Sequence, residues 1–248
     1  MNNFIYENKT KVYFGKNGVK DNLSALLANY GNTVLLAYGG GSIKRNGVYD
    51  EVTAILHDAG KTVIEFSGIM PNPTYAKVQE GAKLARDNHI DLILAVGGGS
   101  VSDCCKIVSA QANLDEDIWE MQTVKHALPN KFIPLGTIVT VFGTGSEMNN
   151  GAVITNEDKK IKGALWGAQA DFAFLDPTYT MSVPMKQVIS GAFDTLSHAM
   201  ETYFGKPDDN NLSDDINEAV MRSTIRNIRV LLTDPENYDA RSELAWAS

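Results

Sequence analysis

Short apolar runs alternate with amphipathic stretches along much of this sequence, from about residue 34 to residue 174. Four runs have the composition of strands buried on both faces: residues 34–38, 62–66, 92–96 and 132–139. Three stretches between them have the apolar spacing of helices: residues 47–59, 75–89 and 100–113. This alternation predicts an α/β fold, a parallel sheet covered by helices. Ahead of it, we expect an outlying strand pair in residues 4–14.

The character of the chain changes after residues 176–177, an Asp-Pro pair. Residues 185–204 and 213–232 have helical spacing, and no strand candidate follows them. A further helix is expected over residues 240–248, with Asp239 as its cap. We therefore predict an α/β domain in residues 1–183 and an all-α domain in residues 184–248. Because the last helix reaches Ser248 without a stop signal, we expect the all-α domain to be incomplete.

Charge and cysteine content exclude several classes of protein. The 30 acidic residues outnumber the 22 basic ones, and the formal charge of −8 argues against nucleic acid or an anionic membrane as a partner. No signal peptide is visible, and no apolar stretch approaches the ~20 residues that cross a bilayer. Cys104 and Cys105 are adjacent, so they cannot form the framework of a secreted disulfide protein. We therefore expect a reduced, soluble, cytoplasmic protein.

Two glycine-rich turns share one construction: a buried strand, the tetrapeptide Gly-Gly-Gly-Ser and a helix. The tetrapeptides are residues 39–42 and 97–100. Glycines let backbone amides approach a phosphate, and the N-terminus of the next helix adds a positive dipole end. Neither turn has the G-x-G-x-x-G spacing, and each alone is equally well explained as a tight turn without a ligand. Two such turns at the carboxyl ends of parallel strands favour a nucleotide site in a Rossmann-like domain.

Two further features adjoin these turns. Asp103 lies in the first turn of a predicted helix, where its carboxylate either suits the helix dipole or contacts a ligand. Hydroxyl groups and glycines crowd residues 137–149, directly after a predicted strand. These groups either bond phosphate and ribose oxygens or satisfy their own backbone in turns. Together with the glycine turns, we interpret this segment as a third wall of the same crevice.

Asp194 and His198 are the sharpest chemical feature of the helical part. Because they are four residues apart on a helix, both side chains project from one face, and their O and N donors suit Fe²⁺ or Zn²⁺. The alternative is a helix with a polar face. A catalytic site usually has about three protein ligands, and the remaining histidines, His57, His89 and His126, are not placed to join. Any missing ligands then lie beyond the end of the sequence, on another chain, or do not exist.

Seven segments spread along the chain form a distinctive set. They are residues 10–15 (TKVYFG), 38–44 (YGGGSIK), 71–74 (PNPT), 97–103 (GGGSVSD), 143–149 (GTGSEMN), 175–177 (LDP) and 191–198 (GAFDTLSH). In order and combination they resemble the iron-containing (group III) alcohol dehydrogenases, especially the butanol dehydrogenase and broad-range aldehyde reductase branch. The resemblance implies a dinucleotide-binding domain in residues 1–183, followed by an all-helical domain, with the active site in the cleft between them.

The turns and the resemblance together assign a set of residues to cofactor binding. They are Gly39, Gly40, Ser42, Asn72, Gly97, Gly98, Gly99, Ser100, Asp103, Thr140, Thr144, Asn149 and Lys162. By resemblance, Asp194 and His198 match the first two of four metal ligands. The other two ligands and a proton-transferring histidine are expected beyond Ser248, so no catalytic residue is assigned within the chain. In the implied reaction, the metal acts as a Lewis acid and hydride passes between nicotinamide and a primary alcohol or aldehyde.

The first glycine turn bears on the choice of cofactor. Enzymes that favour NAD commonly place a carboxylate after the second strand, where it binds the ribose hydroxyls. Here the turn contains only small residues, and the nearest charges after it are Lys44 and Arg45. Small residues leave room for a 2′-phosphate, and cations complement it. We therefore predict NADP(H), with NAD(H) as the alternative, and a divalent metal, Fe²⁺ or Zn²⁺.

Two alternatives to a butanol-type dehydrogenase stay open: a non-catalytic nucleotide-binding fragment and a glycerol dehydrogenase-type relative. With two metal donors, this polypeptide by itself is expected to have no useful alcohol dehydrogenase activity. The predicted partners are a small alcohol or aldehyde and a second copy of the chain in a homodimer.

Overall fold

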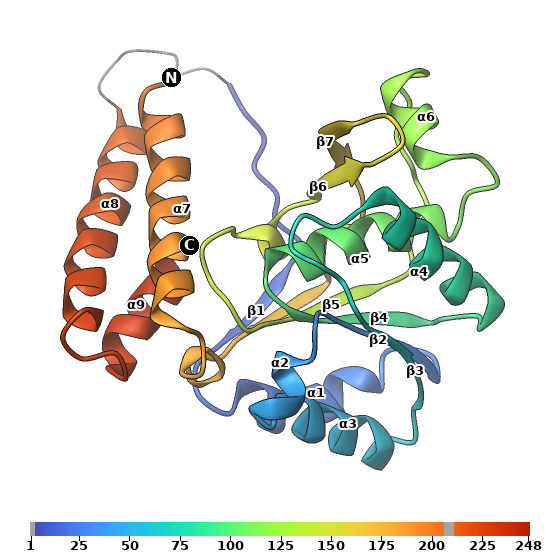
Figure 1. Cartoon of the computed structure of the whole chain (residues 1–248), viewed down its shortest axis with the longest axis horizontal. Helices are drawn as coiled ribbons and strands as arrows, with labels where there is room; N and C mark the ends of the chain where they lie inside the picture. Colours follow the sequence, from blue (N-terminus) through green and yellow to red (C-terminus); the bar gives the residue numbers. More distant parts are fainter. Residues whose placement is uncertain (1–2, 206–210) are drawn as a thin grey trace.

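The structure, a computed structural model that describes residues 3–205 and 211–248, is built around a six-stranded parallel sheet (Figure 1). The strands are β1 (Lys11–Phe14), β2 (Thr33–Tyr38), β3 (Thr62–Phe66), β4 (Leu92–Gly97), β5 (Leu135–Val139) and β8 (Phe172–Leu175). Their order across the sheet is β1-β8-β5-β4-β2-β3, and every neighbouring pair is parallel. The predicted α/β class is therefore confirmed.

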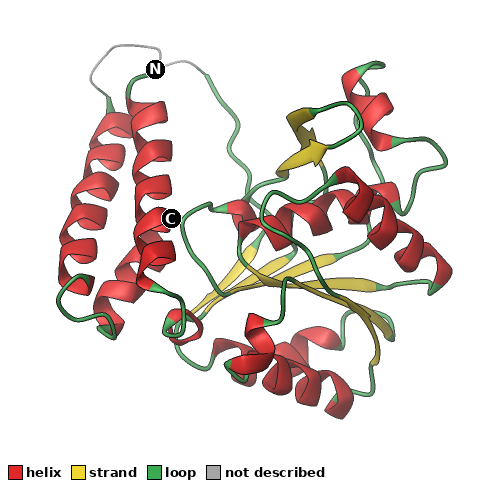
Figure 2. Ribbon diagram, in the orientation of Figure 1, coloured by secondary structure: helices red, strands yellow, loops and turns green. Residues whose placement is uncertain are grey.

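Helices cover both faces of this sheet (Figure 2). One face carries α1 (Gly18–Leu27), the short α2 (Ser42–Arg45) and α3 (Val48–Asp58), and the other carries α4 (Tyr75–Asp87) and α5 (Gly99–Gln111). Alternate residues of β2 belong to the two cores: Val34 and Leu36 pack with α1 and α3, whereas Leu35 packs with α4 and α5. Burial on both faces explains why this strand is apolar throughout.

The strands differ from the sequence expectations at β1, at β8, which lies outside the four predicted runs, and at a hairpin. The expected strand pair in residues 4–14 is wrong: within the described residues 3–14 the strand is β1, which pairs with β8 about 160 residues later. The antiparallel hairpin of β6 (Gly151–Asn156) and β7 (Ile161–Trp166) was not predicted. Long-range pairing leaves no local signal, and the hairpin turn, residues 157–160 (EDKK), lacks the Asn-Gly or Asp-Gly pair that marks tight hairpins. The short α6 (Ile118–Thr123) packs beside β7.

Three helices follow the sheet and pack against one another: α7 (Met185–Tyr203), α8 (Leu212–Leu231) and α9 (Tyr238–Ala247). A capping box of Asn211 and Asp214 begins α8. The cap of α9 is Asn237, whose side chain accepts a hydrogen bond from the Ala240 amide at 2.9 Å, rather than the expected Asp239. The domain division at residues 183 and 184 remains a prediction. Within the described ranges, no helix combines the length and apolar content needed to span a membrane.

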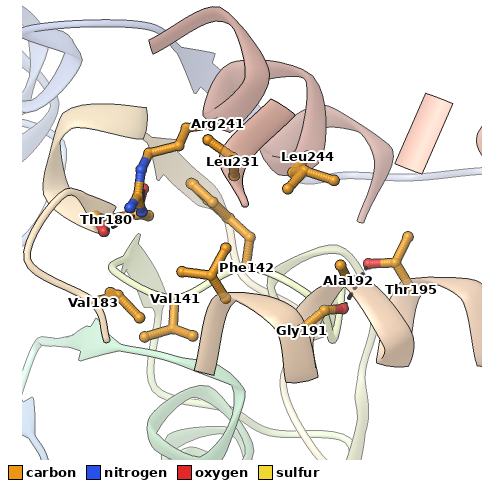
Figure 3. A pocket seen from close by; sticks show the side chains of 11 residues that line it. Val141, Phe142, Thr180, Val183, Gly191, Ala192, Thr195, Leu231, Arg241 and Leu244 are labelled. Atoms are coloured by element: carbon orange, nitrogen blue, oxygen red, sulfur yellow. Dashed lines mark hydrogen bonds between the residues drawn. The ribbon is translucent and has the colours of Figure 1, made fainter. Parts of the chain in front are cut away.

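A buried arginine fastens these helices to the end of the sheet. Arg241 on α9 is 4% exposed. Its Nη1 donates to the carbonyl oxygen of Thr180, in the 3₁₀ turn η2 (Pro177–Thr180), at 2.5 Å, and its Nε donates to the Pro235 carbonyl at 2.8 Å. Figure 3 shows Arg241 and Thr180 beside a small cavity that Val141 and Leu231 also line. The helical part is thus held by a charged group whose hydrogen bonds replace those it would make with water.

The two cysteines lie in the core between the sheet and its helices. Cys104 and Cys105 are free, fully buried, and packed among apolar side chains of the face covered by α4 and α5. Burial raises the pKa of the Cys104 thiol from 9.0 to about 12, and burial also raises the pKa of Cys105. Both residues therefore act as small apolar groups.

We expect neither thiol of the native protein to react with an aromatic disulfide reagent at about pH 8, because the thiolate is the reactive form. Both should react promptly in guanidinium chloride. Above pH 9.0 the unfolded chain loses thiol protons that the folded chain keeps until about pH 12, so this contribution to stability declines across that interval. Rapid labelling of the native protein would contradict the burial of these groups.

Candidate functional site

The two glycine turns lie side by side because β2 and β4 are neighbours in the sheet. The register pairs Tyr38 with Val96, the residues that precede the two tetrapeptides by one position. The chain passes from β2 to β3 on one side, whereas β4 lies on the other side of β2, so the strand order reverses here. Open α/β sheets bind ligands outside the carboxyl ends of strands at such a switch point. The turns therefore stand where a nucleotide is expected.

A large hollow, which we call the glycine hollow, opens between these turns and α7. Its volume is about 790 Å³. The predicted site residues that line it are Gly39, Gly40, Ser42, Gly97, Gly98, Gly99, Ser100, Thr140, Thr144 and Asp194. Because α5 begins at Gly99, its positive dipole end faces this space. A Cβ on Gly99 would lie 2.5 Å from the Thr144 hydroxyl oxygen, so glycine permits the close approach of the third wall.

Backbone contact brings α7 against the same wall. Gly143 has a φ of 141°, and a Cβ there would lie 2.6 Å from the Cα of Gly191 on α7. A Cβ on Gly191 would in turn lie 2.2 Å from the carbonyl oxygen of Phe142. Any larger side chain at either position would force the helix away from the loop. The next turn of α7 carries Asp194, which this contact places at the edge of the glycine hollow.

A second hollow, the polar hollow, continues from the first and has a volume of about 670 Å³. The remaining predicted site residues line it: Asn72, Asp103, Asn149, Lys162 and His198. The two hollows share Gly99, Ser100, Thr144 and Asp194. Lys162 reaches the hollow from β7, and its Nζ donates to Asn72 Oδ1 at 2.7 Å across 90 residues of sequence. All the predicted site residues therefore border one continuous cleft, and their binding roles remain predictions.

Asp194 and His198 face the polar hollow together. Asp194 Oδ2 and His198 Nε2 are 3.8 Å apart, and the two side chains are 46% and 59% exposed. A carboxylate oxygen and an imidazole nitrogen on one helix face fit a divalent metal such as Fe²⁺ or Zn²⁺. Across residues 3–205 and 211–248, no cluster of three or more His, Cys, Asp or Glu side chains is placed to hold an ion. The pair thus supplies part of a donor set.

The structure also identifies a residue to which the sequence analysis gave no role, Lys106. Its side chain is wholly buried in α5, and burial lowers its pKa to about 8 although Asp103 and Glu147 oppose the shift. Asp103 itself accepts hydrogen bonds from the Ser146 hydroxyl at 2.6 Å and the Val153 amide at 2.9 Å. The Asp103 carboxylate therefore bonds to the segment after Gly145, a role that the sequence did not predict. The expected place of Asp103 in the first turn of its helix is wrong, because α5 begins at Gly99 and its first turn holds no acidic residue. A lone lysine in the run Cys-Cys-Lys-Ile-Val was the available signal for Lys106.

Comparison with known families accounts for this arrangement. The sequence profile of the family "Iron-containing alcohol dehydrogenase" matches residues 9–177, and that of "Fe-containing alcohol dehydrogenase family, C-terminal" matches residues 188–248. The chain belongs to the iron-containing alcohol dehydrogenase family.

Several members of this family are similar over the full chain. A probable NADH-dependent butanol dehydrogenase of Bacillus subtilis is 43% identical over 99% of the chain, and the NADPH-dependent aldehyde reductase YqhD of Escherichia coli is 38% identical over 100% of it. The crystal structure of an NADH-dependent butanol dehydrogenase A from Thermotoga maritima superposes with a TM-score of 0.93 at 36% identity, covering 100% of this chain and 62% of that one. The chain spans 64% of the length of each of the first two relatives.

Lys162 offers a direct test of the polar hollow. We expect Lys162→Ala to weaken nicotinamide cofactor binding by about 1–2 kcal/mol, the scale of a charged hydrogen bond. Lys159→Ala is the matched control, because Lys159 lies on the same hairpin but pairs with Glu120 at the surface. Dissociation constants from fluorescence titration measure both effects. If the Lys162→Ala variant and the unmodified chain bind the cofactor with equal affinity, Lys162 does not contribute to cofactor binding.

Proposed function

We propose that this protein is an NAD(P)-linked, metal-dependent alcohol dehydrogenase or aldehyde reductase of the butanol dehydrogenase kind. One observation carries the proposal: the glycine hollow and the polar hollow share Asp194, so the residues predicted to bind a nucleotide and those predicted to bind a metal border one cleft. Family membership and the relatives, which are named for NADH-dependent butanol dehydrogenases and an NADPH-dependent aldehyde reductase, support the same function.

The chain's own residues divide the work of binding between the two hollows. The tetrapeptides at residues 39–42 and 97–100 bring backbone amides to the cofactor phosphates, assisted by the N-terminus of α5. Lys162 and Asn72 present an ammonium and an amide to the other end of the cleft. The wall of residues 140–144 closes the space between them, so the cofactor lies along the shared boundary.

Asp194 and His198 would hold the divalent ion, which when bound would supply Lewis-acid polarisation of the substrate oxygen beside a hydride-transferring nicotinamide. Their place on α7 fixes both donors relative to the cofactor wall, because Gly191 on the same helix contacts Gly143. Orientation of the substrate against the cofactor is thus the contribution of α7.

For the cofactor we propose NADP(H), with NAD(H) as the alternative. A Cβ on Gly40 would meet no atom within 4 Å, which leaves room for a 2′-phosphate. Lys44, the first cation after the tetrapeptide in the sequence, forms a salt bridge with Glu65, whose carboxylate lies 3.3 Å from the Lys44 Nζ. Hydrogen bonds from the hydroxyls of Tyr38 and Tyr49 lower the pKa of Glu65, so Glu65 stays charged and competes with a phosphate for Lys44.

Cofactor preference has a two-sided test. Gly40→Asp should weaken NADPH binding roughly tenfold or more, because two unit charges at about 4 Å repel by about 1–4 kcal/mol near a protein surface. Glu65→Gln should strengthen NADPH binding relative to NADH by freeing Lys44. Glu80→Gln on α4, which is exposed and pairs with Lys77, is the control. Tighter binding of NADH than NADPH by the unmodified chain would establish the alternative.

A second candidate function is nucleotide binding without catalysis, which the two-donor metal site favours.

For the enzyme, we also propose a primary alcohol or aldehyde as the substrate, a homodimer as the assembly, and a cytoplasmic location. The negative charge of −8 supports the absence of a nucleic-acid or anionic-membrane partner.

A comparison of the 248-residue chain with a longer chimera distinguishes dehydrogenase activity from nucleotide binding alone. We expect the 248-residue chain to bind NAD(P)H, to exchange Fe²⁺ or Zn²⁺ readily, and to show no useful reduction of butanal. A chimera that continues from Ser248 with the corresponding remainder of the Bacillus subtilis relative should reduce butanal. In that chimera His198→Ala should abolish turnover and metal retention while cofactor affinity stays within about twofold, because His198 supplies a metal donor. Full turnover by the 248-residue chain would show that two donors suffice, and an inactive, metal-free chimera would favour the nucleotide-binding function.

A further inference from the structure

The buried ammonium of Lys106 bonds to a segment that forms part of the cleft wall. Every residue of α5 from Cys104 to Gln111 is buried, and Lys106 is among the largest side chains with no exposed surface. A buried ammonium is costly unless its protons are all bonded. Lys106 Nζ meets this requirement with three acceptors, so its position is closely determined.

All three acceptors belong to one short segment, residues 146–151, which begins in the third wall and continues to the start of β6. Lys106 Nζ donates to Ser146 Oγ at 2.8 Å, to Asn149 Oδ1 at 2.9 Å and to the carbonyl oxygen of Gly151 at 2.7 Å. The bonds thus join the 3₁₀ turn η1 (Ser146–Met148) to the first residue of β6. One charged atom sets the distance between these two parts of the wall.

Asp103 completes the connection from the preceding turn of the same helix. Its carboxylate accepts from Ser146 and from the Val153 amide, and its Oδ1 lies 3.7 Å from Lys106 Nζ. Glu147, which is 4% exposed, also raises the pKa of the ammonium, although burial raises the pKa of its own carboxyl. Residues 146–153 are therefore fastened to α5 at several points through two side chains of opposite charge.

The other side of this segment faces the cleft. Asn149, Gly151 and Val153 line the polar hollow, which Asp194 and His198 also line. The side chain of Lys106 does not line either hollow. Any effect that it has on a bound molecule must therefore pass through the wall.

We propose that Lys106 is a positioning residue, which holds residues 146–151 in place and thereby sets the affinity of the polar hollow for the nicotinamide half of the cofactor. The proposal rests on the proposed function, because it takes the polar hollow as the site of that half. The adenosine diphosphate half lies along the glycine hollow, whose tetrapeptides Lys106 does not contact. Loss of the ammonium should therefore weaken the binding of the whole dinucleotide more than the binding of ADP.

The experiment compares Lys106→Met with the unmodified chain. Methionine keeps a long unbranched side chain and removes the charge and the donors. Dissociation constants are measured for NADPH, NADH and ADP, with the emission of Trp166, which lines the polar hollow, as one signal. We expect at least tenfold weaker binding of the tighter dinucleotide and ADP binding within twofold. Lys83→Met, on the exposed face of α4 and paired with Asp87, should change neither constant.

A second variant covers the case in which Lys106→Met does not fold, as judged by circular dichroism and thermal unfolding. Ser146→Ala removes the hydroxyl between Lys106 and Asp103 while leaving the buried ammonium in place. It should produce the same selective loss for the dinucleotide, at least threefold.

The outcomes distinguish this inference from the proposed function. If the unmodified chain binds neither dinucleotide, the proposed function fails and the inference fails with it. If the unmodified chain binds a dinucleotide and the folded variants bind it equally well, the inference alone is overturned. Equal losses for the dinucleotide and ADP would assign Lys106 to general stability and would also overturn it.

Discussion

The parallel pairing of β2 with β4 is the constraint on which the rest of the site depends. Neighbouring strands lie about 4.8 Å apart, so strands in register deliver the residues that follow them to adjacent points on one edge. Here the paired residues are Tyr38 and Val96, and each is followed by the same tetrapeptide. Had another strand separated β2 from β4, the two turns could not have bordered one hollow. Packing of β2 and β4 into two different cores favours this register, because a slip of one residue would exchange the side chains of the two faces.

Two further contacts turn this edge into a cleft with distinct walls. The backbones of Gly143 and Gly191 touch, which brings α7 and its Asp194 to the end of the sheet. Lys106 and Asp103 fasten the segment after Gly143 to α5. The first contact depends on the absence of side chains and the second on a buried charge with matched acceptors. Both are intolerant of substitution, and they place the nucleotide side and the metal-donor side of the cleft against each other.

The strands and helices that the sequence predicted correctly are those whose partners impose a local pattern. The central strands β2 and β4 are continuous apolar runs because helices cover both faces, and α7 and α8 show one apolar stripe because they pack on one side. The sequence predicted a strand pair where β1 lies but not its true partner β8, which is about 160 residues away. Among the elements that it missed are β8, α1, α6 and the β6–β7 hairpin, which is half exposed. Strand pairing leaves little trace in local periodicity.

The sequence by itself determined the residue types of the site: the two tetrapeptides, the hydroxyl-rich wall, and the Asp194 and His198 pair, all of which border the cleft in the structure. Only the tertiary structure decided which of them meet. It brings Lys162 to Asn72 across 90 residues and turns the Asp103 carboxylate towards the wall. It also shows that Lys106 is buried. Spacing along a helix or strand encodes the direction in which a side chain points, whereas contacts between distant segments depend on how the buried surfaces of whole elements fit together.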